Sequence, residues 1–311
     1  MKNIYLILFL ALCTTDTFAQ IQAKVSLGNL EILPSFKSKY VTDRKIEVWL
    51  PENYTTTKKY NVLYMHDGQM LFDAETTWNK QAWEVDETIG NLLKENKIKD
   101  LIVVGIWNGE ATRHMDYFPQ KPFESLSKSQ QDSIFEANRN NGQKVFTTHK
   151  LNSDNYLKFL VTEVKPLVDK KYSVYTDAQH TFVAGSSMGG LISMYALCEY
   201  PKVFGGAICM STHWPGIFKV DGNPIPKAFF DYMSKKLPDP KNHKIYFDYG
   251  TETLDALYQT LQPKADVILK QKGYNAKNWL TKKFIGDDHS EKSWGNRFAI
   301  PIEFMLGNKT I

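Results

Sequence analysis

The chain has 311 residues, 42% of them hydrophobic, and its 38 basic and 34 acidic side chains give a formal net charge of +4. This length suits one large α/β domain or two smaller ones and excludes a small disulfide-stapled module. The near balance of charge, without a basic block, argues against a nucleic-acid partner.

The N-terminus, MKNIYLILFLALCTTDTFAQ, has the pattern of a secretory signal peptide. The small residues Thr17 and Ala19 predict cleavage after Ala19, which leaves a mature domain of residues 20–311. The apolar core of this segment is too short to span a bilayer, and no other stretch is long enough, so we expect a secreted or periplasmic protein without a membrane span. A lipoprotein anchor at Cys13 is the alternative, which Leu12 disfavours because a small residue is expected before the cysteine.

Cleavage would leave Cys198 and Cys209 as the only cysteines. An exported protein could join them in a disulfide. Because one lies on the expected helix after the GSSMGG string and the other lies in a following apolar run, we expect two buried free thiols instead.

The pattern of apolar residues predicts two antiparallel strands followed by alternating strands and helices. In chain order we expect antiparallel strands at 24–32 and 39–50, strand 62–65, helix 81–95, strand 101–106, helix 155–170, strand 182–184, helix 191–199, strands 206–210 and 244–249, helix 254–272, strand 279–284 and helix 293–306. Such alternation predicts one α/β domain with a mostly parallel sheet and helices on both faces.

Two insertions interrupt this alternation. Residues 119–151 are polar, and residues 213–243 are rich in proline. In an open α/β sheet, ligands bind at the carboxyl ends of the strands, so insertions that follow strands can form the walls or the lid of a crevice. Solvated excursions on the surface are the alternative.

The string GSSMGG, from Gly185 to Gly190, lies between an expected strand and an expected helix and matches G-x-S-x-G. In this nucleophile elbow a serine occupies a sharp, strained turn with its hydroxyl exposed. Glycine inside regular structure costs about 0.5–1 kcal/mol relative to alanine, so these glycines need a geometric reason. The motif predicts Ser187 as a nucleophile, and because it also arises by chance, the assignment depends on partners elsewhere in the chain.

A serine nucleophile needs a base, which is most often histidine. In the α/β-hydrolase order of serine, acid and histidine, the candidates are His213, His243 and His289. His243 precedes a strand and therefore lies at the wrong end of the sheet, whereas His213 leaves little chain for an acid after Ser187. His289, in FIGDDHSEKSW just past the last strand, is the predicted base.

The acid is expected after the preceding strand, in FDYGTETLDALY, where Asp248, Glu252 and Asp255 compete. Asp248 lies within the apolar strand, and Asp287 and Asp288 are too close in sequence to His289 to meet its ring. We favour Asp255 and keep Glu252 as the alternative.

Two backbone N–H groups should form an oxyanion hole. One is the amide of Met188, directly after the nucleophile, and the other is the amide of Gln69, in a loop where Gly68 allows a tight turn. His66 and Asp67 in the same loop lack further ligands at the spacing of a metal site, so we expect no metal and no cofactor.

The strings MHDGQMLFD, RHMDYFP, GSSMGG, FDYGTETLDALY and GDDHSEKSW together resemble the putative-esterase family of the α/β-hydrolases, over about residues 46–306. This family includes enterochelin-type siderophore esterases, feruloyl and acetyl-xylan esterases of carbohydrate esterase family one, S-formylglutathione hydrolases and mycolyltransferases. The resemblance implies an α/β-hydrolase fold with lid-like insertions.

The resemblance also implies a nucleophile at Ser187, a base at His289 and an acid at Asp255, with the amides of Gln69 and Met188 as the oxyanion hole. The chain departs from the family at the acid. The family's acid often lies two or three residues after the glycine that ends the strand, here Gly250, and Asp255 lies further on.

The segment RHMDYFP carries Arg113, Asp116 and Tyr117 just after a strand end. These side chains could bind substrate, but we expect them to pair with each other and brace the loop.

These residues predict an exported serine esterase that hydrolyses acyl or aryl esters of a sugar or siderophore scaffold through an acyl-enzyme. An acyltransferase with the same residues, and a non-catalytic glycan- or peptide-binding protein on the same fold, are the alternatives. The expected partner is a small-molecule or glycan-linked ester. Aromatic residues of the second insertion could line the crevice or form a small core beneath the loop: Trp214, Phe218, Phe229, Phe230 and Tyr232.

Overall fold

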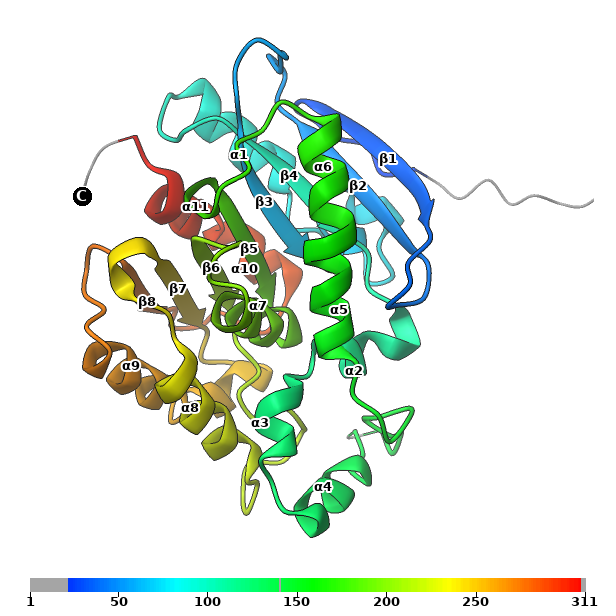
Figure 1. Ribbon diagram of the computed structural model, residues 1–311, viewed down its shortest axis with the longest axis vertical. Coiled ribbons are helices and arrows are strands. Elements are labelled where there is room, and N and C mark those ends of the chain that lie inside the picture. The colour runs from blue at the N-terminus through cyan, green and yellow to red at the C-terminus, as the bar shows by residue number, and fades with distance from the viewer. Residues whose placement is uncertain (1–21, 140, 309–311) are drawn as a thin grey trace, which may run out of the picture.

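The computed structural model describes residues 22–139 and 141–308 (Figure 1). The predicted signal peptide, its cleavage site and Cys13 lie outside this range. Among the described helices, none has the length and apolar character needed to cross a membrane.

An eight-stranded sheet, in the order β1-β2-β4-β3-β5-β6-β7-β8, forms the centre of the molecule. The pairs β1–β2 and β2–β4 are antiparallel and the other pairs are parallel, which confirms the predicted α/β class. The strands are β1 (Asn29–Phe36), β2 (Arg44–Leu50), β3 (Asn61–His66), β4 (Leu101–Ile106), β5 (Thr181–Ser186), β6 (Gly206–Met210), β7 (Lys244–Tyr249) and β8 (Trp279–Lys283).

The central strands are apolar on both faces of the sheet, as expected for parallel strands covered by helices. Successive side chains of a strand point to opposite faces. In β3, Val62 and Tyr64 therefore pack into one core cluster, whereas Leu63 and Met65 pack into the other. Two cores thus hold the sheet from opposite sides.

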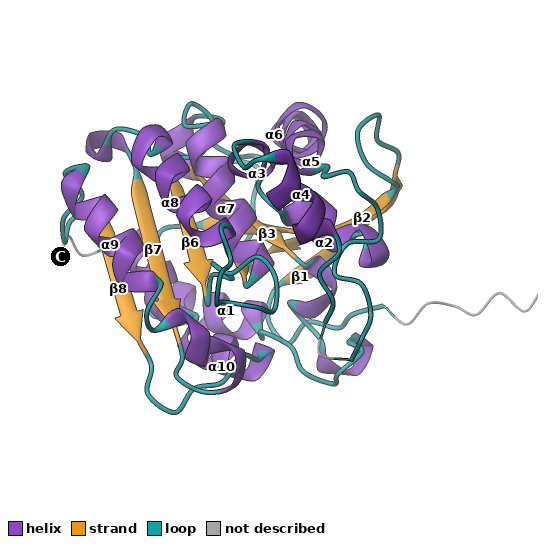
Figure 2. Cartoon of the chain, turned by 90° about the horizontal axis from the view of Figure 1, so that it is seen from below, coloured by secondary structure: helices purple, strands orange, loops and turns teal. Residues whose placement is uncertain are grey.

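Helices cover both faces of the sheet, as Figure 2 shows. The larger core includes side chains of α5 to α9, and the smaller one includes side chains of α1, α10 and α11. The α-helices are α1 (Val85–Lys94), α2 (Arg113–Tyr117), α3 (Gln120–Glu124), α4 (Lys128–Phe135), α5 (Ser153–Phe159), α6 (Lys165–Lys171), α7 (Met188–Glu199), α8 (Ile225–Lys236), α9 (Gln262–Gln271), α10 (Glu291–Arg297) and α11 (Ala299–Leu306). Shorter helical turns are η1 (Gly68–Met70), η2 (Ala74–Thr76), η3 (Glu110–Thr112), the π-helical η4 (Leu160–Val164) between α5 and α6, η5 (Ala178–His180), η6 (Pro240–Asn242) and η7 (Thr253–Tyr258).

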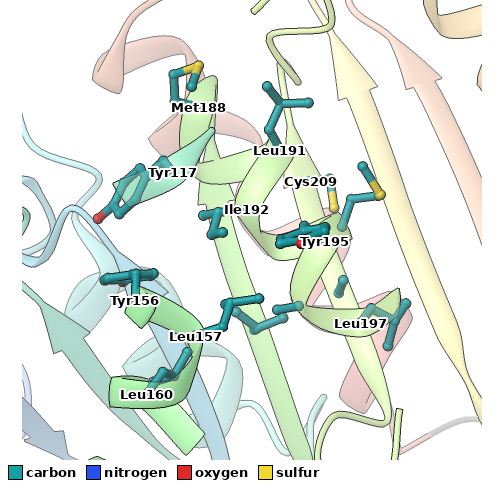
Figure 3. Close-up of a cluster of buried hydrophobic side chains, with 14 of the residues drawn as sticks. Tyr117, Tyr156, Leu157, Leu160, Met188, Leu191, Ile192, Tyr195, Leu197 and Cys209 are labelled. Atoms are coloured by element: carbon teal, nitrogen blue, oxygen red, sulfur yellow. The ribbon is translucent and has the colours of Figure 1, made fainter. Parts of the chain in front are cut away.

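Helix α7, which follows the GSSMGG string, is buried along almost its whole length and packs against β5 and β6 and against the helices α2 and α8. Figure 3 shows side chains of α5, among them Leu157, directed toward Ile192 and Tyr195 of α7. A helix held on all sides cannot shift without opening the core, so its N-terminus is a rigid platform.

Two expected long helices are interrupted, each near a proline. The segment predicted as helix 254–272 consists of η7 and α9, and Pro263 lies in the first turn of α9, where its missing N–H costs nothing. The segment predicted as helix 293–306 is divided into α10 and α11. Pro301 has no N–H to donate to the carbonyl group of Arg297, the last residue of α10.

The first insertion is more than a solvated excursion. Although its surface is polar, it contains α3 and α4, and Phe123, Phe135 and Phe146 pack edge-on into the larger core. The two cysteines also follow expectation, since both Cys198 and Cys209 are buried free thiols.

Candidate active site

The GSSMGG string forms a strained turn between β5 and α7. Ser187 has φ 56° and ψ −120°, a conformation that costs a non-glycine residue about 1–3 kcal/mol. A Cβ atom at Gly185 would lie 2.8 Å from the backbone of Gly189, and one at Gly190 would lie 2.9 Å from the Thr212 hydroxyl. The glycines are therefore required by close packing around the elbow.

Ser187 lines a cavity of about 640 Å³ at the carboxyl ends of the strands. Loops that follow β3, β4, β5, β6, β7 and β8 all contribute to it, as expected for an open α/β sheet. Of the five predicted site residues, Gln69, Ser187, Met188 and His289 line this cavity. The fifth, Asp255, is fully buried behind His289.

Asp255 is the carboxylate that contacts the predicted base. The Nδ1 atom of His289 lies 2.5 Å from Asp255 Oδ1, and the imidazole edge packs against Trp294 with the ring centroids 4.9 Å apart. The alternative acid, Glu252, is exposed and hydrogen-bonds the neighbouring Thr251. The contacts of His289 therefore favour Asp255.

A buried polar network holds Asp255 in place. Its Oδ2 atom accepts from the Gly250 N–H at 2.6 Å and from the Ser211 hydroxyl at 2.5 Å. Ser211 Oγ accepts in turn from Trp294 Nε1 and from Arg297 Nη2, each at 2.9 Å. With both lone pairs occupied, the Ser211 proton is directed at Asp255.

Arg297 also explains the buried Asp248. As expected, Asp248 does not contact His289; it forms an ion pair with Arg297, whose Nη2 lies 3.0 Å from Asp248 Oδ1. Burial raises the pKa of Asp248, and the Arg297 charge opposes this effect. Sequence reasoning missed Ser211, Trp294 and Arg297. The one signal in the sequence was the group of acidic residues near His289, because acidic side chains that are buried together need a cation such as Arg297 beside them.

The loop after β3 presents the predicted second oxyanion donor. The amide of Gln69 belongs to the first turn of η1, and that of Met188 begins α7, so neither has a partner within its own helix. Gly68 is required there, because a Cβ atom would lie 2.8 Å from the backbone of β4 at Gly105. Gln69 and Met188 line the same cavity as Ser187.

Asp67 anchors this loop, and its partner corrects an expectation. Arg113 forms a two-pronged ion pair with Asp67 at 2.6 and 2.7 Å, whereas Asp116 pairs with Arg44 at 2.6 Å. The Tyr117 hydroxyl accepts from the Asp67 N–H. Arg113 does pair with Tyr117, since its guanidinium lies 5.2 Å from the centroid of that ring. The two charged residues, however, form ion pairs with other segments rather than with each other. Burial raises the pKa of Asp67, yet the Arg113 charge holds it below its usual value.

For the aromatic residues of the second insertion, the structure favours a core beneath the loop over a wall of the crevice. Trp214 is fully buried and donates from Nε1 to Gln262, and only Phe218 of the five aromatic residues lines the cavity. The others belong to the core beneath the loop: Phe229, Phe230 and Tyr232. At the rim lies a tryptophan that sequence reasoning missed, Trp78, which is 84% exposed.

His66 and Asp67 have protein partners rather than the surroundings of a metal site. His66 Nδ1 lies 2.7 Å from the Tyr156 hydroxyl, and Asp67 is paired with Arg113. Within residues 22–139 and 141–308, no three His, Cys, Asp or Glu side chains come together in a group that could hold a metal ion.

Comparison with known proteins agrees with this architecture. A curated relative, the uncharacterized protein YbbA of Bacillus subtilis, is 25% identical over 85% of this chain and 93% of its own length. An endo-1,4-beta-xylanase/feruloyl esterase of Xylanibacter ruminicola is 24% identical over 71% of this chain, which corresponds to 27% of that larger protein. The solved structure of a ferulic acid esterase from the anaerobic fungus Anaeromyces mucronatus superposes with a TM-score of 0.60 at 20% identity, covering 93% of this chain and 94% of that one.

The family model described as Putative esterase matches residues 38–299, which include the elbow, the loop after β3 and the His289 loop. The fold is that of the α/β-hydrolase esterases, and a carboxylic ester hydrolase is the activity that goes with it. The chain therefore belongs to the Putative esterase family.

Proposed function

We propose that the protein is a serine esterase that cleaves carboxylic esters through an acyl-enzyme on Ser187. The observation that carries this proposal is the strained Ser187 turn in the same cavity as His289, whose imidazole is held by the buried Asp255. A binding module would have no use for a strained serine beside an oriented imidazole.

In the first half of the reaction, His289 takes the Ser187 proton while Oγ bonds to the ester carbonyl carbon. The carbonyl oxygen becomes an oxyanion that the amides of Gln69 and Met188 stabilise, at a position where each such donor is worth about 3 kcal/mol. The C–O bond then breaks, and His289 returns the proton to the departing alcohol. Asp255 stabilises the imidazolium ion that exists between these two transfers.

In the second half, His289 removes a proton from water, and the hydroxide oxygen bonds to the carbonyl carbon of the acyl-enzyme. The bond to Ser187 Oγ breaks, and the proton passes from His289 to Oγ. The products are a carboxylic acid and the regenerated serine hydroxyl. No cofactor takes part in these steps.

The cavity rim supports a sugar ester as the substrate. Trp78 offers an exposed ring on which a pyranose can stack, and the amides of Asn79, Gln81 and Asn108 line the same cavity. Amide groups both donate and accept hydrogen bonds, which suits the hydroxyl groups of a sugar.

Charge in the cavity argues against a siderophore substrate, which would carry several negative charges. The Arg113 charge is already neutralised by Asp67, and the remaining charged residues of the lining, Arg139 and Glu291, are of opposite sign. A multiply charged anion would therefore find no surplus of positive charge. We propose a sugar ester in preference to a siderophore, and export by the predicted signal peptide would bring the enzyme to it.

The test is a single-residue comparison in the protein that begins at residue 20. It should hydrolyse p-nitrophenyl acetate, and a fluorophosphonate should modify Ser187, as located by mass spectrometry of peptides. The Ser187→Ala variant should lose both properties. The matched control is Ser186→Ala, which removes the adjacent hydroxyl and should still be labelled at Ser187. Unchanged turnover in Ser187→Ala would overturn the proposal.

A further inference from the structure

A second side chain of η7, besides Asp255, points into the reaction centre. Tyr258 lies three residues after Asp255 on this 3₁₀ helix and is fully buried. Residues three apart on a 3₁₀ helix share one face, so the turn that aims Asp255 at His289 also aims Tyr258 inward. The Tyr258 and His289 rings pack edge to face with their centroids 5.9 Å apart.

The Tyr258 hydroxyl connects Ser187 to a second histidine. It lies 2.8 Å from His213 Nδ1, and it interacts with the Ser187 side chain. His213 is tied to the elbow as well, because its backbone N–H donates to the Ser187 carbonyl oxygen at 3.1 Å. Ser187 therefore has an imidazole–phenol pair beside it in addition to His289.

The direction of the hydrogen bonds follows from His213. Its side chain is 1% exposed, and burial holds the pKa of the ring well below its usual value, so the neutral ring carries one proton. Nε2 has no hydrogen-bond partner among the described residues. A proton there would be a buried donor left unpaired, whereas a proton on Nδ1 is used in the bond to Tyr258.

If His213 Nδ1 donates to the Tyr258 oxygen, the phenol proton is free for Ser187. Ser187 Oγ can accept it on a lone pair and keep its own proton for His289. Burial and the nearby Asp255 charge hold the pKa of the Tyr258 phenol well above its usual value. Tyr258 therefore retains its proton throughout.

We propose that Tyr258 is a further catalytic residue that donates a hydrogen bond to Ser187 Oγ, and that His213 positions it from behind. The inference rests on the proposed serine esterase function. In the resting enzyme the bond directs the Ser187 proton toward His289. When the acyl-enzyme breaks down, Oγ leaves the carbonyl carbon and takes its proton from His289, and the phenol stabilises the negative charge that builds on Oγ beforehand. Tyr258 transfers no proton in either half of the reaction.

The first experiment compares Tyr258→Phe with Tyr64→Phe. Tyr64, on β3, is also fully buried, but its hydroxyl has no hydrogen-bond partner among the described residues. Tyr258→Phe should lower kcat for p-nitrophenyl acetate about tenfold, the size of one hydrogen bond, and Tyr64→Phe should not. Stopped-flow traces should show the loss mainly in breakdown of the acyl-enzyme, so the acyl-enzyme accumulates. A purely structural role would not slow one half of the reaction selectively.

The second experiment tests the positioning role of His213. In His213→Asn the amide nitrogen can replace Nδ1 as a donor and should preserve most of the rate, whereas His213→Leu should lose about as much as Tyr258→Phe. The double variant Tyr258→Phe with His213→Leu should be no slower than either single variant, because both changes break one chain of bonds. If the leucine variant fails to fold, the Tyr258→Phe and His213→Asn comparisons still decide the matter.

The outcomes separate this inference from the function on which it rests. If Ser187→Ala is inactive while Tyr258→Phe and Tyr64→Phe have the same kcat and the same acyl-enzyme level, the role of Tyr258 is refuted and the esterase stands. If Ser187→Ala is as active as the wild type, the proposed function itself fails. Additive losses in the double variant would refute the positioning role of His213.

Discussion

Replacing Asp255 by asparagine tests how the imidazole is oriented. Two donors face Asp255 Oδ2: the Gly250 N–H at 2.6 Å and the Ser211 hydroxyl, whose own lone pairs are occupied by Trp294 and Arg297. The amide nitrogen of an asparagine cannot face two donors. It would therefore take the Oδ1 position, 2.5 Å from His289 Nδ1.

This geometry forces the wrong tautomer on His289. With an N–H group pointing at it, Nδ1 must accept, so the ring proton moves to Nε2. Nε2 then has no lone pair with which to take the Ser187 proton. We expect kcat to fall on the order of 10⁴-fold, the size known for loss of a triad acid, with KM little changed.

The assay is steady-state hydrolysis of p-nitrophenyl acetate, together with a melting temperature to verify that the variant is folded. Glu252→Gln is the matched control, because Glu252 is an exposed carboxylate of the same loop that bonds only Thr251 among the described partners. Glu252→Gln should change kcat by less than about twofold. A loss of under about tenfold in a folded Asp255→Asn variant, or a larger loss in Glu252→Gln, would refute the reasoning.

Two further predictions concern the rim and the buried histidines. Trp78→Ala should reduce kcat/KM on a feruloylated oligosaccharide about tenfold more than on p-nitrophenyl acetate, at an unchanged melting temperature. Trp214→Ala should instead lower the free energy of unfolding by about 3–5 kcal/mol, because Trp214 is fully buried. The reverse pattern would show that the sugar stacks on Trp214. Burial lowers the pKa of His66 and of His114 to about 3 from an ordinary 6.5, so the unfolded chain takes up protons that the native state does not as pH falls from about 6.5 to 3. Urea unfolding should show stability falling by about 1.4 kcal/mol per pH unit for each ring in that window, and a slope that does not flatten in His66→Gln would contradict this.

Much of the sheet could be predicted because buried parallel strands are short apolar runs. The strands 101–106, 206–210 and 244–249 have the expected bounds. The strained turn at Ser187 could be predicted because the elbow imposes a local pattern of glycines. The position of the His289 loop could be predicted because the end of the last strand fixes where that loop begins.

The remaining features depend on contacts that no local pattern encodes. Glu252 and Asp255 differ little in sequence context, and only the 3₁₀ turn of η7 places Asp255 inward. Trp78 and Trp214 are the same residue type, and the path of each loop decides that Trp78 is exposed and Trp214 is buried. Arg297 donates a hydrogen bond to Ser211, which lies 86 residues earlier in the chain, and no local sequence pattern predicts a contact over that separation.

Backbone strain connects these long-range contacts to the site. The described non-glycine residues with positive φ include Asp67 after β3, Ser187 after β5, Ser211 after β6 and Thr253 after β7, and these strands carry the cavity. Such conformations cost about 1–3 kcal/mol each and persist only where neighbours fix them.

Each strained residue beside Ser187 has a specific anchor from elsewhere in the chain. Asp67 is held by Arg113, Ser211 is held by Arg297, and the Thr253 hydroxyl accepts from the His289 N–H at 2.9 Å. Sequence reasoning missed Arg297, and it named Arg113 and His289 but not as partners of Asp67 and Thr253. Local preference is broken at the Ser187 turn, and distant side chains stabilise what it disfavours, which is why a sequence pattern predicts this turn but not its supports.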